Sequence, residues 1–349
     1  MRPRFLMALL AASLASGCGA AISQGERTRP EPQVVDADVA FVHVTVVPMD
    51  TPREVPRSTV LVKEGRIVFV GPDEAARPGA RARIIDGTGR FLMPGLADMH
   101  VHLNDETYLA LLVANGVTTV RNMWGRPDIL RWRTEIAHGE RLGPTVHTSG
   151  SIVDGLPPVW EHSTVVRDAR EATEVVDTQH AAGYDFIKVY DEISVEAYDA
   201  IAAESKRLGI PFAGHVGRWI GLAHALESHQ KSIEHLGGYF RFLQRDDSPL
   251  RDRTDWPSLF RVSEFMDDAK IPLAVRLTRE AGTWNCATLF VSEAWITAPD
   301  VKREWLTRPE MRYVGPDLRT RWRSSADTHA RASRSRRQST SAGGRAGER

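Results

Sequence analysis

The sequence predicts an α/β fold, a parallel (β/α)8-type barrel preceded by a small β-rich unit. From Gly95 onward, short apolar segments that favour strands alternate with segments that favour helices, an order typical of parallel sheets. Histidines stand at the ends of several of these strands, and the carboxyl edge is where α/β barrels carry catalytic groups. Residues 35–94 are instead rich in β-branched residues and turns, which predicts a β-sandwich half-domain.

The composition is that of a globular protein. The chain has 349 residues, of which 42% are hydrophobic and 26% charged, enough to bury a large core. Its 45 basic residues equal its 45 acidic ones, which argues against a nucleic-acid partner over the whole surface.

The N-terminus predicts export across the inner membrane. Arg2 and Arg4 precede the short apolar run 5–15, and small residues follow it, as in a signal peptide. Cys18 then stands where a bacterial lipobox carries its lipidated cysteine, so we expect a periplasmic or membrane-anchored lipoprotein. Secretion with cleavage elsewhere is the alternative. Lipidation would leave Cys286 without a disulfide partner, as a buried small hydrophobe. The expected boundaries are 1–18 for the signal peptide and 19–34 for a linker.

The β-rich unit is expected to be an antiparallel sheet. Its clearest feature is a hairpin that turns at Glu64-Gly65-Arg66 between two runs of β-formers. The expected strands are 40–47, 59–63, 67–70, 82–86 and 90–93.

The barrel region reads as alternating strands and helices without a recognisable eighth strand. The helix at 194–208 has the clearest ends, a Ser194 cap and a Gly209 stop. After the strand that ends in His100 and His102, strands are expected at 118–122, 145–152, 186–190, 211–216, 232–236 and 286–291. Helices are expected at 106–115, 127–138, 170–182, 194–208, 222–228, 256–268 and 273–281.

Five side chains suggest a metal centre. His100 and His102 share one face of their strand, because side chains alternate along a strand, and two imidazoles can bind one ion. Lys188 lies mid-strand in an apolar run, where a lone ammonium is costly and needs a partner or a modification. His215 and His235 close the next two strands. Taken singly, each histidine reads as an ordinary core residue, and only the set indicates a site.

The stretch from Met93 to His102, together with the order H-x-H, K, H, H, resembles the amidohydrolase superfamily, especially its imidazolonepropionase-like and Xaa-Pro dipeptidase-like branch. The resemblance implies two divalent metal ions, expected to be zinc. It assigns one ion to the strand-one pair and the other to His215 and His235, and it makes Lys188 a bridging carbamate formed with carbon dioxide.

The implied reaction is hydrolysis of a carbon–nitrogen bond by metal-activated water. The implied substrates are small molecules, namely a cyclic amide, an acylated amine or an Xaa-Pro-type dipeptide. A mononuclear deaminase and a non-catalytic metal-binding remnant are the alternatives. The sequence predicts no oligomeric state.

The C-terminal part departs from the family pattern. The family places a general-base aspartate after strand eight, and no counterpart is visible, since Asp300, Asp317 and Asp327 read as surface residues. Residues 323–349 form a basic tail that is expected to be disordered, after an incomplete barrel at 95–322. We interpret this as a frameshift or truncation.

Other side chains near strand ends are candidates for the substrate pocket. They are Asn122, Trp124, Tyr190 and Glu234, with Trp160 and His162 on the loop after strand three.

Overall fold

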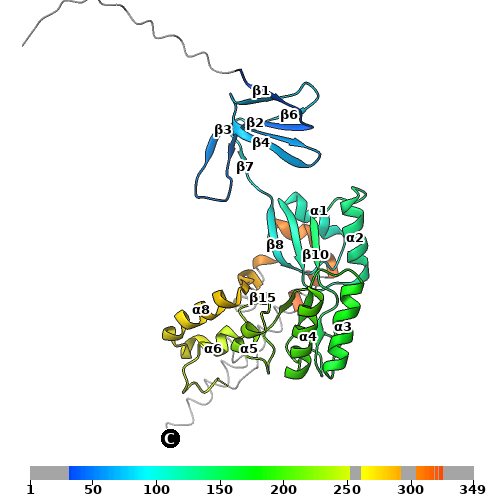
Figure 1. Cartoon of the computed structure of the whole chain (residues 1–349), viewed down its shortest axis with the longest axis vertical. Helices are drawn as coiled ribbons and strands as arrows, with labels where there is room; N and C mark the ends of the chain where they lie inside the picture. Colours follow the sequence, from blue (N-terminus) through cyan, green and yellow to red (C-terminus); the bar gives the residue numbers. More distant parts are fainter. Residues whose placement is uncertain (1–30, 252–260, 292–303, 318, 321, 325–349) are drawn as a thin grey trace, which may run out of the picture. The chain divides into compact units, whose positions relative to one another are not determined.

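The computed structural model describes residues 31–251, 261–291, 304–317, 319–320 and 322–324. The chain divides into two compact units, with the boundary between Pro94 and Gly95 (Figure 1). The expected signal peptide with Cys18, and nearly all of the expected basic tail, lie outside the described residues. Within the described part, no helix is long and apolar enough to span a bilayer.

The first unit is built on a sheet with the order β4-β3-β2-β6, to which β7 adds beside β2. The expected hairpin is present, and Glu64 and Gly65 both have positive φ, as its tight turn requires. The expectation of an antiparallel sheet is corrected, because β2 pairs in parallel with β6 and β7. After β4 the chain crosses to the edge of β2 that faces away from β3. There β6 runs in the same direction as β2. The strands are β1 (Gln33–Val35), β2 (Val39–Val46), β3 (Val55–Lys63), β4 (Arg66–Pro72), β5 (Ala76–Pro78), β6 (Arg83–Asp86) and β7 (Phe91–Leu92).

The second unit contains two parallel sheets, with the orders β10-β9-β8 and β12-β11-β13-β14-β15-β16. A parallel bridge between Ser149 and Phe186 links the two. The predicted α/β class with parallel strands is therefore confirmed, whereas a closed barrel is not seen in the described residues and stays a prediction. The strands are β8 (Leu96–Val101), β9 (Val117–Asn122), β10 (Thr145–Thr148), β11 (Val153–Asp154), β12 (Thr164–Val165), β13 (Ile187–Val189), β14 (Phe212–Gly214), β15 (Ser232–Glu234) and β16 (Trp284–Cys286).

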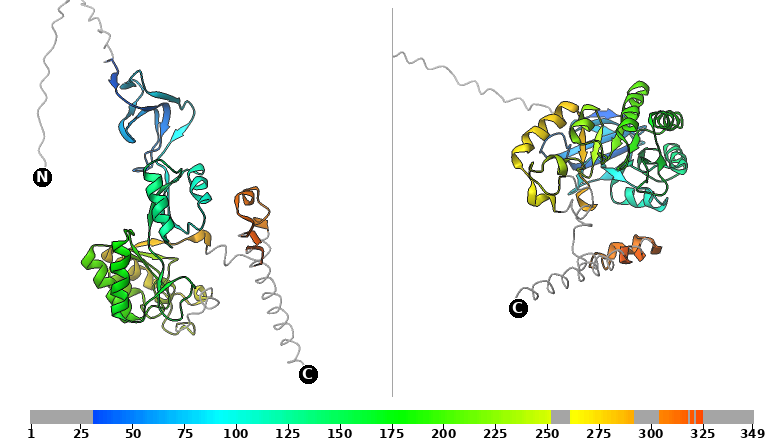
Figure 2. Two further views of the ribbon diagram at one scale, coloured as in Figure 1. Left: turned by 90° about the vertical axis from the view of Figure 1, so that its right-hand side faces the viewer. Right: turned by 90° about the horizontal axis from the view of Figure 1, so that it is seen from below.

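Helices alternate with these strands as predicted. Ser194 caps α4 by accepting a hydrogen bond from the Ala197 backbone N–H, and Gly209 ends it in the left-handed conformation. Figure 2 shows the green helices, which include α3 and α4, outside the strands. The helices are α1 (Thr107–Ala114), α2 (Pro127–Ala137), α3 (Ala169–Ala181), α4 (Val195–Leu208), α5 (Leu222–Glu227), α6 (Tyr239–Phe242) and α8 (Ile271–Ala281).

The main core of this unit lies between β13–β15 and the helices α3, α4 and α5. Ile187, Val189 and Ile233 from the strands are fully buried, as is Tyr198 of α4. The Tyr198 hydroxyl donates a 2.7 Å hydrogen bond to the Gln230 side chain, so its burial leaves no polar cost. This core fixes β13, which contains Lys188, and the strands β14 and β15, which His215 and His235 follow.

Several predicted boundaries are wrong. Strand seven was expected at 286–291 but is β16, and residues 289–291 are helical, because Cys286 already pairs with Glu234 at the last residue of β15. Strand three ends at Thr148, after which β11 pairs with β13 instead. In the expected helix 256–268, the described part forms only 3-10 turns at η1 (Val262–Phe265) and η2 (Asp268–Lys270). The described residues contain no eighth barrel strand; a further 3-10 turn is η3 (Pro309–Tyr313).

Candidate metal centre

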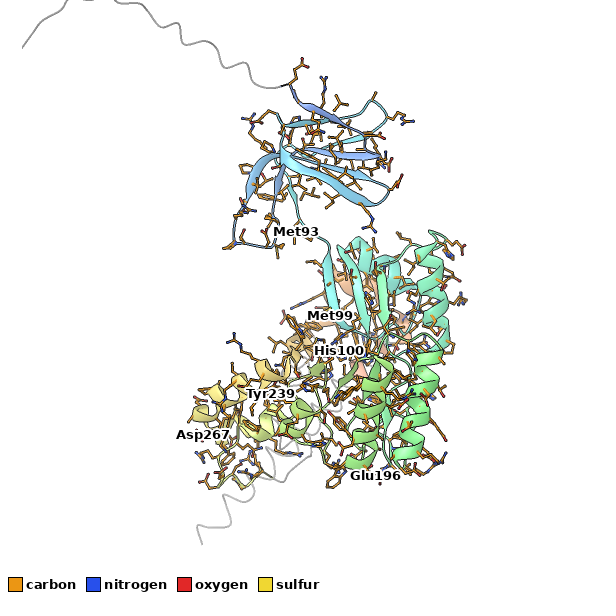
Figure 3. All side chains as sticks on the ribbon, viewed as in Figure 1. Met93, Met99, His100, Glu196, Tyr239 and Asp267 are labelled. Carbon is orange, nitrogen blue, oxygen red and sulfur yellow. The ribbon has the colours of Figure 1, made fainter. Side chains whose placement is uncertain are left out.

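The structure brings the four predicted histidines together. His100 lies near the end of β8 (Figure 3) and His102 just beyond it, while His215 and His235 directly follow β14 and β15. The ring centres of His100 and His102 are 5.4 Å apart, and that of His235 lies 4.7 Å from His100 and 4.9 Å from His215. The imidazoles therefore form one connected cluster at the carboxyl ends of the strands.

Lys188 lies in β13 at the same cluster. The residue is 1% exposed, and its Nζ has no hydrogen-bond partner within the described part of the chain. Burial lowers the pKa of Lys188 to about 8, although the nearby Glu234 carboxylate opposes the shift. The positive charge of Lys188 in turn helps to depress the pKa values of His100 and His102, which places it within electrostatic reach of both. Buried polar groups normally have a bonding partner, so we expect a modification of this amine or a bound metal ion to supply one.

The Nδ1 atoms of three imidazoles lie within hydrogen-bond distance of oxygen atoms of the protein. His100 Nδ1 lies 2.7 Å from Glu234 Oε2, and His215 Nδ1 lies 2.8 Å from Asp191 Oδ1. His235 Nδ1 lies 2.5 Å from the Thr288 hydroxyl. A carboxylate can only accept, so each of the first two rings donates from Nδ1 and keeps Nε2 free as a lone-pair donor. The His215 Nε2 is buried without a hydrogen-bond partner in the described residues, as expected of a metal ligand.

Glu234 is held from several sides. Its side chain is fully buried, and its Oε1 accepts hydrogen bonds from Arg121 at 2.7 Å and from the Ser232 hydroxyl at 2.6 Å. The same guanidinium donates to Ser232 and to the Met99 carbonyl, each at 2.8 Å. Burial would raise the pKa of Glu234, but the hydrogen bond from His100 and the charges of Lys188 and Arg121 bring it down to about 2. The carboxylate is therefore ionised and fixed before any metal ion binds.

Burial also keeps the cluster in the protonation state that a metal ion needs. It lowers the pKa values of His102 and His235 to about 3, with further depression from the neighbouring cationic groups. Neutral imidazole is the ligand form of histidine. The cluster, with its unpartnered nitrogen atoms and its nitrogen- and oxygen-rich donors, therefore fits divalent ions such as zinc.

The predicted pocket residues divide into two groups. Trp124 meets His102 edge-on with ring centres 5.7 Å apart, and the Tyr190 ring centre lies 3.9 Å from that of His215, so both border the cluster. Asn122 and Glu234 are corrected, because both are fully buried and bonded within the protein. Asn122 accepts from the Leu103 N–H and donates to the Trp124 carbonyl and the Thr148 hydroxyl, which makes it a structural link between loops.

The remaining predictions have mixed outcomes. Asp317 is exposed, as expected, while Asp300 and Asp327 lie outside the described residues. Cys286 is only half-buried, and ligand atoms of Cys286, His100 and Glu234 lie within 4.8 Å of one another. Burial and the Glu234 charge raise the pKa of this thiol to about 11, so it is protonated at neutral pH.

The sequence reasoning missed Asp191 and Thr288, which orient two of the histidines. Asp191 follows β13 directly, so its place after a strand end was a usable signal. Thr288 follows the strand whose bounds were misplaced, and no sequence signal pointed to it. The Arg121 side chain was also missed, because an arginine on a strand reads first as a surface residue.

No protein-family model matches the chain. Among curated proteins, an adenine deaminase of Ruegeria pomeroyi is 35% identical over 89 residues, which are 24% of this chain and 15% of that protein. A 5-methylthioadenosine/S-adenosylhomocysteine deaminase of Symbiobacterium thermophilum is 46% identical over 59 residues, which are 17% of this chain and 14% of that protein. The matched segments therefore span only a small part of the length of these relatives.

Solved structures match over more of the chain. A bottromycin amidohydrolase superposes with a TM-score of 0.58 at 24% identity, covering 85% of this chain and 65% of that one. An Xaa-Pro dipeptidase with bound methionine gives a TM-score of 0.55 at 18% identity, covering 83% and 74%. These likenesses show the fold. The local similarity to deaminases agrees with the amidohydrolase resemblance of the sequence motif.

Proposed function

We propose that the protein is a metal-dependent hydrolase of a carbon–nitrogen bond in a small molecule, such as a cyclic amide, an acylated amine or an Xaa-Pro-type dipeptide. One observation carries the proposal: four imidazoles form a connected cluster, and a buried lysine that lacks a partner in the described residues lies within electrostatic reach of three of them. Its buried nitrogen atoms without a partner in the described residues, Lys188 Nζ and His215 Nε2, are costly unless a bound ion or a modification completes them.

In this proposal His100 and His102 hold one divalent ion, His215 and His235 hold a second, and Lys188 reaches both. Zinc is the proposed ion. When bound, such ions polarise a carbonyl group and lower the pKa of water. The protein itself supplies neutral imidazoles in fixed orientations, and the carboxylates of Glu234 and Asp191 hold the Nδ1 protons of His100 and His215.

Lys188 is proposed to carry a carbamate. Its amine nitrogen adds to carbon dioxide, a carbon–nitrogen bond forms, and one proton is released. The reaction needs the neutral amine, and the lowered pKa of Lys188 supports its presence near neutral pH. The product places a carboxylate-like group where the unpartnered Nζ now lies. Mass spectrometry under carbon dioxide, with and without zinc, tests this modification.

Turnover is tested with the zinc-loaded full chain against a panel of acylated amines, cyclic amides and dipeptides, with His100→Ala as the control. Hydrolysis that depends on His100 supports the proposal. Zinc uptake without such hydrolysis would support the non-catalytic alternative. The described residues offer no counterpart of the strand-eight aspartate, and loss of a general base costs about 10²–10⁴-fold in rate.

A deaminase is the second candidate, favoured by the names of the curated relatives. It also breaks a carbon–nitrogen bond with water, but it releases ammonia from a ring carbon. Ammonia release from adenine or 5-methylthioadenosine, with about one metal ion per active chain, would support this alternative over the amide hydrolase.

We further propose that the protein is exported and anchored in the membrane through a lipid on Cys18, which its signal-like N-terminus supports. Incorporation of labelled palmitate that is lost in Cys18→Ala tests this placement; equal labelling of the variant would refute it.

A further inference from the structure

A row of aromatic rings borders the metal centre from His102 to His215. Trp124 lies edge-on to His102, and its ring centre is 5.7 Å from that of Trp160. Trp160 Nε1 donates a 2.8 Å hydrogen bond to the Tyr190 hydroxyl, and the Tyr190 ring centre lies 3.9 Å from that of His215. The row therefore connects the two pairs of histidines that are proposed to hold separate ions.

The row is assembled from three loops at the carboxyl ends of the strands. Trp124 follows β9, Tyr190 follows β13, and Trp160 lies in the loop 155–163 between β11 and β12. Trp160 is 43% exposed although it contacts both of its ring neighbours. A half-exposed indole with a bonded N–H, next to a buried cluster of ligands, offers an apolar face to whatever enters the site.

A buried carboxylate holds the Trp160 loop in place. Asp154 is fully buried, and its oxygens accept backbone N–H groups of Gly155 and Val159, each at 2.9 Å, and of Glu192 at 2.8 Å. The first two donors belong to the loop, and the third lies two residues after Tyr190. Asp154 therefore ties the loop that carries Trp160 to the segment that carries its bonded partner.

Gly155 shows how closely these two segments approach. A Cβ atom at this position would lie 1.9 Å from the Glu192 carbonyl oxygen, so only glycine fits without a backbone shift. The loop base is thus packed directly on the chain that leaves β13. The position of Trp160 is therefore fixed by the contacts of its loop, unlike that of a freely rotating surface side chain.

We propose that Trp160 determines specificity by contacting a flat, uncharged group of the substrate, such as an aryl or cyclic amine, and that Asp154 is its positioning residue. This inference rests on the proposed function of the same centre. The row offers indole and phenol surfaces, and the nearby carboxylates of Asp191 and Glu234 are already bonded to histidines. The site therefore favours acylated aryl amines or cyclic amides over zwitterionic dipeptides.

The test measures binding, so it does not depend on turnover. Ligand-observed NMR titrations of the zinc-loaded full chain compare acetanilide with N-methylacetamide, which differ in the flat group. We expect acetanilide to bind about tenfold more tightly, because stacking on an indole adds to the burial of the ring. Trp160→Ala should remove this preference, and Trp160→Phe should keep most of it. A chain that shows this pattern but hydrolyses nothing would retain the recognition site while failing the proposed function.

Asp154→Asn separates positioning from contact, because the amide cannot accept all three N–H groups. We expect it to weaken acetanilide binding nearly as much as Trp160→Ala, with unchanged zinc content. Trp284→Ala is the matched control, since Trp284 is exposed at the amino end of β16, and it should leave the preference intact. Equal binding of the two amides by the wild-type chain would overturn the proposal. Tighter binding of tetramethylammonium than of acetanilide would overturn it too, since aromatic rings also attract cations.

Discussion

The two halves of the proposed metal centre, the pair His100 and His102 and the pair His215 and His235, are held differently, although each contains a histidine bonded to an acidic side chain. The partner of His100 is Glu234, which is fully buried and also bonded to Arg121 and Ser232. The partner of His215 is Asp191, whose side chain is 32% exposed. His235 relies on a threonine hydroxyl. The first half is therefore fixed by the protein core, whereas the second depends more on its surroundings at the rim. We expect the ion held by His100 and His102 to bind more tightly.

Removal of a ligand from either half should have the largest effect. His100→Ala and His235→Ala should each lower the zinc content from about two to about one ion per chain, because each takes a nitrogen donor from one position. Turnover, where present, should fall about a thousandfold or more, since the lost polarisation is worth several kcal/mol. Elemental analysis and hydrolysis assays check this, with exposed His147→Ala as the control. Unchanged zinc content in both variants would show that the two histidine pairs do not hold separate ions.

Lys188 is buried within electrostatic reach of His100, His102 and His235, and its charge should affect the stability of the metal-free protein. Its pKa is about 8 in the folded chain against an ordinary 10.5, so the unfolded state holds more protons between these values. Stability should therefore rise with pH across this interval, by about 3 kcal/mol at most. Urea unfolding with chelator and without carbon dioxide, compared with Lys188→Met, measures the difference. A variant with the same pH slope as the wild type would show that the amine is not buried as described.

Two matched substitutions compare the acidic partners of His100 and His215 directly. Glu234→Gln keeps an acceptor for His100 but loses the charge, and zinc affinity should fall about 10- to 100-fold. Asp191→Asn should cost less, because this carboxylate is partly exposed and water can replace it. Chelator competition on both variants gives the affinities. A larger loss for Asp191→Asn would reverse the assignment of the tighter half.

The smallest effect is expected at Ser232. Its hydroxyl bridges Arg121 and Glu234, so Ser232→Ala removes one support while the Arg121 contact to Glu234 remains. Stability should fall by about 1 kcal/mol, the usual value of a buried hydrogen bond, and zinc affinity should change little. Thermal unfolding and chelator competition report the two quantities separately. A loss of zinc affinity as large as that of Glu234→Gln would contradict this division of roles.

The sequence was informative where a local pattern decides the structure. Apolar periodicity, Ser194 and Gly209 placed both ends of α4 within one residue, and the strand-end positions of the histidines were enough to group them. Strand bounds were harder, since those of β16 follow from its pairing with β15 and not from its own apolar run. The orienting groups were hardest to predict. Arg121 and Glu234 are more than a hundred residues apart, so only the fold shows that they meet.

Arg121 and Glu234 join β9 to β15, and the same guanidinium contacts the backbone of β8. This cross-link ties together distant parts of the chain whether or not any reaction takes place. Selection for a soluble, foldable protein would therefore preserve much of the ligand arrangement even in a descendant that had lost its chemistry. The spacing of the ligands should therefore survive removal of the metal.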